Sequence, residues 1–467
     1  MKQTISALAI AASMAFAPTA AQADDRPPFA DKAMELLREA VSMRTAQGHG
    51  EVPRLAAYLA NEFRKGGFAD EDIHLLPMGE TAALVVRYKG DGSAGKKPIS
   101  LSAHMDVVDA LPEDWERDPF TLIEEDGYLF GRGVLDNKMG IVSLTTAFLR
   151  LKAEGFVPSR DLIIAFSGDE ETDMTTTKAL VNEYRHLTDS EFVLNADAGG
   201  GALSEDGSVI SYNLQAAEKT YVSFEMAITN PGGHSSRPRP DNAIYELATA
   251  LKNIEAYKFP AQASELTRAF FAASADKAGG DLGKAMARFS QNPEDEWAVK
   301  TLRSYPEYVG TTGTTCVTTM LKAGHAENAL PQSASAVVNC RIFPGAGVEN
   351  TLNTLKSVAG NDAIVWREMK EPTESAASPL RDDVMAVLER AVHAQHPGIK
   401  IIPYMESGGT DGMHFRAAGI ESYGMSGVFI KGSDMFAHGL NERVPVESLW
   451  GSLRHWHLIL TDIAGKN

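Results

Sequence analysis

The stretch DLIIAFSGDEE, residues 161–171, leads from a hydrophobic segment directly into three adjacent carboxylates. Residues 161–166 form a short apolar run, as in a buried β-strand. Carboxylates packed side by side without cations raise one another's pKa. A metal ion removes that conflict, because one carboxylate can bind the ion while its neighbour stays free as a base. A Glu-Glu pair taken alone more often belongs to a solvated loop.

Other stretches of the chain end in the same kind of side chain. They are His104-Met105-Asp106, Asp136-Asn137-Lys138, the region of Asp197, and, near the C-terminus, His438. With the first stretch they offer two imidazoles and three carboxylates, plus one spare carboxylate. That set suits a pair of divalent cations and a general base, so the sequence predicts a hydrolase.

Asp106 lies two residues after His104. Side chains two apart on a strand project from the same face, so we expect the Asp106 carboxylate to reach the His104 imidazole. A carboxylate behind a ligating histidine fixes the tautomer and raises the basicity of the ring.

Hydrophobic patterns around these stretches predict strands at 82–88, 98–103, 161–166 and 191–194, with a helix at 138–154. Strand, helix and strand with candidate ligands at the carboxyl ends indicate a doubly wound α/β sheet.

A chain of 467 residues exceeds one ordinary core, so two domains are expected. Near Ala217 the pattern changes, and residues 220–228 alternate polar and apolar side chains as a half-exposed strand does. Patterns of the first kind resume at 380–396. The predicted division is a catalytic domain of residues 24–216 and 370–467, an inserted domain of residues 217–369, and within it a helical insertion at 264–304.

The balance of charge excludes some partners. The chain carries 44 basic and 62 acidic residues, a net charge of −18. Phosphate groups would be repelled, so neither nucleic acid nor an anionic membrane surface is expected as a partner. No stretch after the N-terminal segment is long and apolar enough to span a bilayer.

Residues 1–23 resemble a secretory signal peptide. Lys2 supplies the basic end, an apolar stretch follows at 5–16, and Ala21-Gln22-Ala23 is a small-residue cleavage site. We expect a mature protein that begins near Asp24 and is exported, most naturally to a bacterial periplasm. An N-terminal amphipathic helix is the structural alternative.

Cys316 and Cys340 are the two cysteines of the chain. They could pair or remain buried thiols, and the sequence leaves both possibilities open. A structural zinc site is not expected from two cysteines so far from other ligand clusters.

The order of these motifs resembles the co-catalytic zinc metallohydrolases. That family includes acetylornithine deacetylase, succinyl-diaminopimelate desuccinylase, aminoacylase, carnosinase-type dipeptidases and carboxypeptidase S. The stretches PGGHSS, residues 231–236, and HGLNE, residues 438–442, are most similar to the carboxypeptidase S branch with its N-acyl-amino-acid hydrolases. Met139 departs from the pattern, since many members have glycine there.

The resemblance implies a role for each candidate. Asp136 would bridge two zinc ions, with His104 and Asp197 on one and Glu171 and His438 on the other. Manganese or cobalt could replace zinc at such oxygen and nitrogen donors. Glu170 would be the general base.

The same resemblance implies an α+β, ferredoxin-like inserted domain that serves as a lid and as the contact of a homodimer. His234 would reach the partner subunit's site and stabilise the oxyanion. Arg341, and similarly Asn328, would bind a substrate carboxylate. Gly408, Gly409 and Thr410 would line the pocket for that carboxylate. Taken alone, His234 is a turn residue and Arg341 a surface ion pair.

The expected function is an exported, zinc-dependent amidohydrolase that cleaves dipeptides or N-acyl amino acids with a free carboxylate. One alternative is a deacylase of a small acylated metabolite. Another is a periplasmic protein that captures peptides or metal without turnover, although such a protein has no need of Glu170 beside Glu171.

Overall fold

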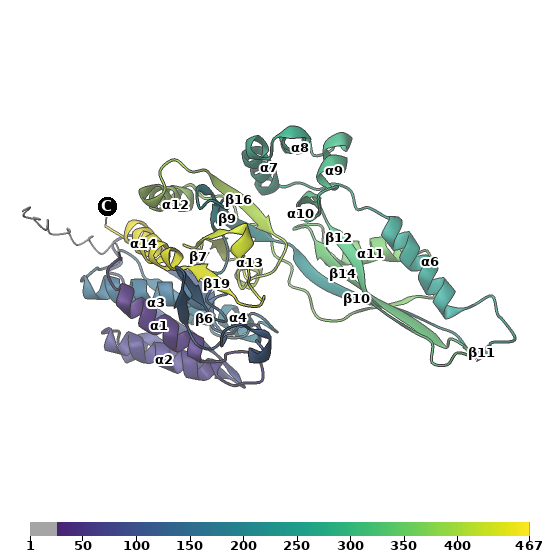
Figure 1. Ribbon diagram of the computed structural model, residues 1–467, viewed down its shortest axis with the longest axis horizontal. Coiled ribbons are helices and arrows are strands. Elements are labelled where there is room, and N and C mark those ends of the chain that lie inside the picture. Colours follow the sequence, from purple (N-terminus) through teal and green to yellow (C-terminus); the bar gives the residue numbers. More distant parts are fainter. Residues whose placement is uncertain (1–25, 467) are drawn as a thin grey trace, which may run out of the picture.

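The computed structural model describes residues 26–466, so the predicted signal peptide lies outside the described residues. The chain forms a compact body and a long arm (Figure 1). A large mixed sheet lies in the body, and a smaller antiparallel sheet runs along the arm.

Ten strands of the described chain make the large sheet, in the order β1-β2-β6-β3-β7-β17-β9-β8-β18, with β16 also beside β9. Their bounds are β1 Ile73–Met78, β2 Thr81–Tyr88, β3 Ile99–His104, β6 Leu162–Ser167, β7 Phe192–Asn195, β8 Gly200–Leu203, β9 Val209–Glu218, β16 Ile401–Glu406, β17 Glu421–Gly424 and β18 Phe429–Lys431. The central strands β3, β6 and β7 are parallel. Every residue of β3 and β6 is buried, as expected for parallel strands covered on both faces.

Helices cover both faces of this sheet. On one face the even-numbered side chains of β6, such as Ile164, pack with α1 Ala30–Ser42, α2 Val52–Lys65, α3 Lys138–Ala153, α12 Asp382–Gln395 and α14 Val446–Ile463. On the other face Ile163 and Ala165 pack with α4 Thr175–Val181 and α13 Gly412–Ala417, near α5 Arg185–Thr188. The alternation of strand side chains therefore builds the predicted doubly wound architecture.

The arm contains a four-stranded antiparallel sheet in the order β12-β14-β10-β15. Its elements are β10 Thr220–Thr229, α6 Ala243–Ala256, β12 Thr315–Ala323, β14 Ser333–Ile342, α11 Val348–Ala359 and β15 Val365–Glu368. Both helices pack on one face of the sheet. This strand and helix order confirms the predicted ferredoxin-like inserted unit. At its tip β11 Gly233–His234 pairs with β13 Ala329–Leu330.

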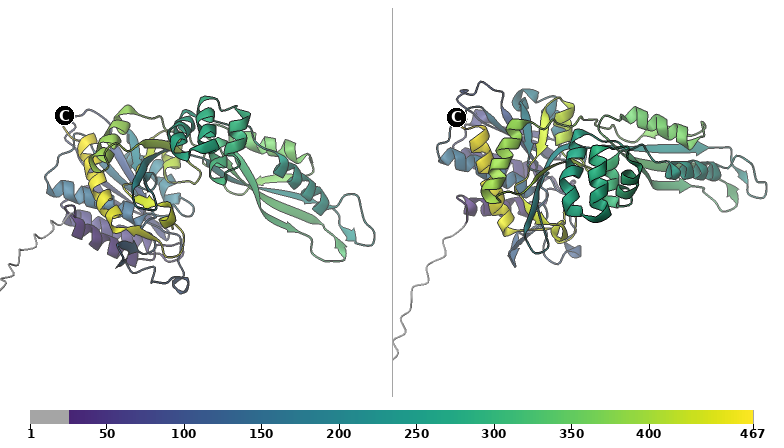
Figure 2. Two further views of the ribbon diagram at one scale, coloured as in Figure 1. Left: turned by 45° about the horizontal axis from the view of Figure 1, so that its top comes forward. Right: turned by 90° about the horizontal axis from the view of Figure 1, so that it is seen from above.

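A helical insertion separates α6 from β12. It consists of α7 Glu265–Ala278, α8 Gly280–Gln291, α9 Glu296–Leu302 and α10 Pro306–Val309, and it has its own small core. Helix α7 packs against β16 of the large sheet. Both views of Figure 2 place these helices where the body and the arm meet.

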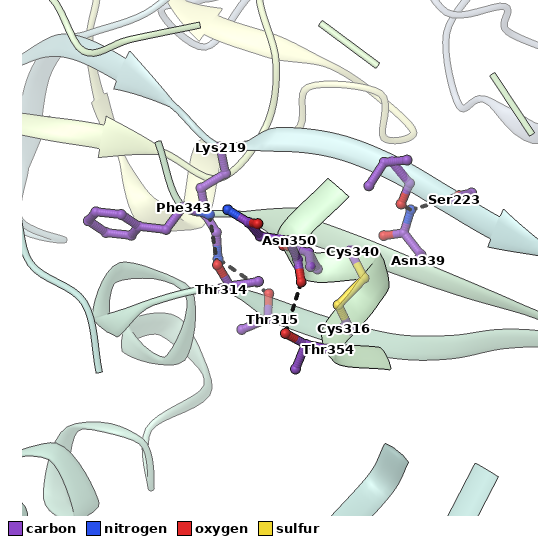
Figure 3. Close-up of a disulfide and its surroundings, with 12 residues drawn as sticks. Lys219, Ser223, Thr314, Thr315, Cys316, Asn339, Cys340, Phe343, Asn350 and Thr354 are labelled. Carbon is purple, nitrogen blue, oxygen red and sulfur yellow. Dashed lines mark hydrogen bonds between the residues drawn. A yellow bond between two sulfur atoms is a disulfide. The ribbon is translucent and has the colours of Figure 1, made fainter. Parts of the chain in front are cut away.

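Cys316 on β12 and Cys340 on β14 form a disulfide between directly opposed residues (Figure 3). This settles the alternative that the sequence left open. In residues 26–466 no helix is long and apolar enough to cross a membrane.

Candidate metal centre

Five candidate side chains converge at one edge of the large sheet. His104 is the last residue of β3, Glu171 follows β6 and Asp197 follows β7. Since these strands are parallel, their carboxyl ends meet at the same edge. Asp136 lies just before α3, and His438 lies on the loop before β19 Arg443–Pro445.

The Asp136 carboxylate lies between the two imidazoles. Its Oδ1 is 2.9 Å from His104 Nε2, and its Oδ2 is 3.0 Å from His438 Nε2. Asp197 Oδ1 is 3.3 Å from His104 Nε2, and Glu171 Oε1 is 2.9 Å from His438 Nε2. The five side chains thus form two groups that share Asp136.

This donor set fits divalent metal ions. Ligand atoms of His104, Asp136 and Glu171 all lie within 4.8 Å of one another. Nitrogen and carboxylate oxygen donors without a thiolate suit zinc, manganese or cobalt. His104 is buried, whereas 52% of the His438 side chain is exposed, so the group is open on one side.

Electrostatics also favour bound cations here. Burial, with the nearby Asp136 charge, raises the pKa of Asp197 to about 7, and burial raises the pKa of Glu170 above its ordinary value. Hydrogen bonds to Asp136 and Glu171 raise the pKa of His438 to about 10. Burial thus disfavours the charged forms of Asp197 and Glu170, and a bound divalent ion would stabilise these carboxylates.

Asp106 supports the site differently from the expectation. His104 Nδ1 lies 3.0 Å from the Asp106 backbone carbonyl oxygen and 3.4 Å from the carboxylate. The carboxylate instead accepts hydrogen bonds from the backbone N–H groups of Glu170, at 3.1 Å, and Glu171, at 3.0 Å. The reason is that β3 ends at His104, so Asp106 no longer follows the strand geometry.

Glu442 is a functional candidate that the sequence reasoning missed. It is completely buried and accepts hydrogen bonds from Arg132 Nη1 and from the backbone N–H groups of Gly133, Leu135 and Asp136. Glu442 therefore fixes the loop that presents Asp136. The signal available was its place four residues after His438, but its partners lie about 300 residues earlier in the chain.

A cavity of about 560 Å³ is lined by four of the five side chains, those of Asp136, Glu171, Asp197 and His438, and also by Glu170. Arg341 enters this cavity from β14. Its guanidinium lies 4.6 Å from the centre of the Tyr221 ring, and Nη1 donates a hydrogen bond to the Ser407 carbonyl at 3.0 Å. The structure thus brings Arg341 to the same cavity as the metal-site candidates.

The predicted loop of Gly408, Gly409 and Thr410 lines that cavity. Both the backbone N–H and the hydroxyl of Thr410 donate to the buried Glu218 carboxylate, at 3.1 Å and 2.6 Å. The next residue, Asp411, accepts hydrogen bonds from Ser167 and Thr177. Glu218 and Asp411 therefore hold the loop against the sheet, and neither was predicted.

His234 and Asn328 lie away from this group. Both are at the tip of the arm, which Figure 1 places at the end remote from the large sheet. His234 is exposed, and its Nδ1 accepts hydrogen bonds from the backbone N–H and the hydroxyl of Ser236, at 3.2 Å and 2.8 Å. Within one chain they are not brought to the metal-site candidates.

Residues 100–462 match the model of peptidase family M20/M25/M40. The N-fatty-acyl-amino acid synthase/hydrolase PM20D1 of Xenopus tropicalis is 28% identical over 367 residues, which cover 75% of this chain and 70% of that protein. The probable carboxypeptidase S-like 2 of Dictyostelium discoideum is 26% identical over 382 residues, covering 78% and 71%.

Solved structures share the fold. The M20 family metallo-carboxypeptidase Sso-CP2 from Sulfolobus solfataricus superposes with a TM-score of 0.69 at 18% identity, covering 93% of this chain and 99% of that one. The di-peptidase Dug1p from Saccharomyces cerevisiae gives a TM-score of 0.64 at 16% identity, covering 94% and 97%.

The relatives confirm the predicted resemblance to the carboxypeptidase S and N-acyl-amino-acid hydrolase branch. They also confirm the prediction of an enzyme that hydrolyses peptide or amide bonds. The chain belongs to peptidase family M20/M25/M40.

Proposed function

We propose that the protein is a zinc-dependent amidohydrolase that cleaves dipeptides or N-acyl amino acids bearing a free carboxylate. One observation carries the proposal. Two imidazoles share the Asp136 carboxylate, and Glu170 and Arg341 line the same cavity. A candidate metal site, a candidate base and a candidate anion receptor thus meet where one small substrate could touch all three.

His104, Asp136, Asp197, Glu171 and His438 would hold two zinc ions, with Asp136 between them. Bound zinc supplies a Lewis acid that polarises the scissile carbonyl and acidifies water. Glu170 takes the proton from the attacking water and delivers it to the leaving nitrogen, a role for which a raised pKa is suited. Asp106 keeps Glu170 in place through its backbone N–H.

The substrate's carboxylate is assigned to Arg341 and the loop of Gly408, Gly409 and Thr410. A planar guanidinium pairs with a carboxylate through two parallel hydrogen bonds. Glycine leaves the backbone amides of the loop open to an anion. Anchored there, the substrate presents its amide bond to the metal-site candidates. The name of the Xenopus relative, a hydrolase of N-fatty-acyl amino acids, supports the N-acyl class.

The Cys316–Cys340 disulfide supports an oxidising compartment and therefore export, since disulfides persist in secreted and periplasmic proteins. A homodimer is part of the proposal, because His234 and Asn328 lie at the arm tip, where they could enter only another subunit's site.

The test begins with elemental analysis and a panel of dipeptides and N-acyl amino acids of increasing acyl length. Metal-loaded wild type is expected to hydrolyse members of the panel and to lose that activity on chelation. Glu170→Gln is expected to keep its metal and lose at least about a hundredfold in kcat, the usual contribution of a general base. Glu183→Gln, at an exposed position of the same body, is the matched control. A metal-loaded wild type that cleaves no amide of the panel would refute the proposal.

A further inference from the structure

Lys219 is the single residue between β9 and β10, the strands through which the chain passes from the large sheet to the arm sheet. Lysine is almost never fully buried unless it is paired. Nevertheless Lys219 is only 2% exposed. A lysine buried at this junction needs a physical explanation.

The Lys219 ammonium is held by neutral acceptors. Nζ donates to the carbonyls of Gly310, at 3.1 Å, and Gly313, at 2.7 Å, and to the Thr315 hydroxyl, at 3.3 Å. These three acceptors match the three N–H donors of an ammonium group. Within residues 26–466 no carboxylate forms an ion pair with it. Figure 3 shows Lys219 reaching towards Thr314 and Thr315, beside the disulfide.

Two further cations lie near Lys219. Burial, together with the charges of Arg341 and Arg303, lowers the pKa of Lys219 to about 7. Arg303 donates to the carbonyls of Phe259 and Thr312 and has no ion-pair partner in the described chain. Arg341 donates to a carbonyl too, with Glu406 as the acid within electrostatic reach. Lys219, Arg303 and Arg341, called here the junction cations, therefore produce a positive field with little compensation from the chain.

Of the junction cations, Arg341 lines the cavity next to the metal-site candidates. Thr315, which accepts from Lys219, is paired across the strands with Arg341, and the disulfide links the next pair. Lys219 is thus tied to the strand ends that carry Arg341. Its neighbour Glu218 binds Thr410 on the loop opposite. One dipeptide therefore connects both sides of the expected carboxylate pocket.

We propose that Lys219 is a positioning and specificity-determining residue, which holds Arg341 in register and, in its ammonium form, adds positive potential for the carboxylate of the substrate. This inference rests on the proposed function for the identity of the ligand. The missing counter-ion of the junction cations is the carboxylate of an amino acid or peptide. A substrate without that charge gains nothing from Lys219.

The test compares binding of N-acetyl-L-leucine and its carboxamide to metal-loaded full-length protein by calorimetry, in the Glu170→Gln background. Lys219→Gln removes the charge but keeps two donors for the carbonyls. It is expected to weaken binding of the carboxylate roughly tenfold, an effect typical of one unit charge in a partly screened site, and to change carboxamide binding less than about twofold. Lys219→Arg retains the charge and is expected to retain the preference. Lys356→Met removes an exposed lysine of the arm and is the matched control.

If Lys219→Gln weakened binding of N-acetyl-L-leucine and of its carboxamide equally, Lys219 would have only a structural role and the proposal would be overturned. Unchanged binding of both ligands would overturn it too. If Lys219→Gln does not fold, Arg303→Gln removes another junction cation, and it is expected to reduce the preference about threefold. No reduction there overturns the proposal as well. Failure of the proposed function can be distinguished from failure of this inference. In that case the wild type hydrolyses neither ligand, although its preference for the carboxylate over the carboxamide can still be measured by binding.

Discussion

Glu442 is a buried side chain that fixes the loop carrying Asp136 although it is not itself a candidate metal ligand. Its carboxylate offsets the buried Arg132 guanidinium, which is 2% exposed, and accepts from the loop before Asp136. Breaking a buried ion pair from one side costs about 3 kcal/mol or more. Glu442→Gln is therefore expected to lower the free energy of unfolding by about 3 kcal/mol, measured by urea denaturation. It is also expected to reduce the metal content, measured by elemental analysis. Exposed Glu447→Gln should change stability by less than about 0.5 kcal/mol. A variant as stable as wild type would contradict this reading.

If His438 is a metal ligand as proposed, metal binding depends on pH. Asp136 and Glu171 raise its pKa to about 10 in the metal-free protein, so the imidazole is protonated at pH 7. The pKa of His438 is higher in the folded protein than in the unfolded chain. The interaction of protonated His438 with Asp136 and Glu171 therefore stabilises the metal-free protein fully below about pH 6.5, and this stabilisation is lost as the pH rises through the folded pKa. A histidine binds a metal ion only as the neutral imidazole, so zinc binding at His438 would displace this proton.

We therefore expect zinc affinity to rise up to about tenfold per pH unit between pH 6 and 8 for each proton released. Calorimetry in two buffers of different ionisation enthalpy counts the protons. His438→Gln should lose both the proton release and the affinity, whereas His457→Gln, on the outside of α14, should lose neither. Zinc binding that releases no proton would exclude His438 as a ligand.

The convergence of the five candidates could be predicted, because each stands at the end of a recognisable strand or in an ordered motif. Their roles as ligands stay predictions. Glu442, Asp411 and Glu218 could not be found in this way. Each is an acid that looks like surface in the sequence and is buried only because donors distant in the chain surround it.

Among the elements, the β12–β14 pair carries the disulfide. It closes a separation of 24 residues, and a loop of that size corresponds to about 3 kcal/mol of stabilisation. Cys316→Ser with Cys340→Ser is expected to destabilise the arm by about 3 kcal/mol in urea unfolding followed by hydrogen exchange. A reducing agent should destabilise the wild type by the same amount as the double substitution and should leave the stability of the double variant unchanged. An arm that unfolds at the same urea concentration in both proteins would show that the bond adds nothing.

Most core elements could be located from periodicity, as for β6 and α3, within a residue or two of their bounds. Strand β9 could not be located in this way. The sequence places the start of the second domain near Ala217, which lies close to the end of β9. The cause is polar residues inside it. Gln215 and Glu218 are buried because they bond to each other, and Glu218 also bonds to Thr410 and Arg416. Periodicity reads only the local chain and assigns such residues to the surface.

For the whole molecule, the proposed exchange of His234 between subunits can be tested by mixing variants. Glu170→Gln and His234→Ala are each expected to be inactive. Random mixing makes half of the dimers hybrid, and each hybrid contains one site with both residues, so about a quarter of wild-type activity should return. If His234 acted within its own chain, or not at all, mixing would restore no activity. Light scattering checks that the protein is a dimer.

The strands β10 and β15, which begin and end the arm unit, lie side by side, with Phe224 opposite Glu368. All five candidate ligands and Glu170 fall outside this continuous segment, while His234, Asn328 and Arg341 fall inside it. The candidate metal ligands and the candidate base are thus encoded outside the arm segment, whereas Arg341 of the proposed carboxylate pocket is encoded inside it. Replacement of the single continuous segment 220–368 could therefore change which substrates are bound, while the proposed metal ligands and base stay the same.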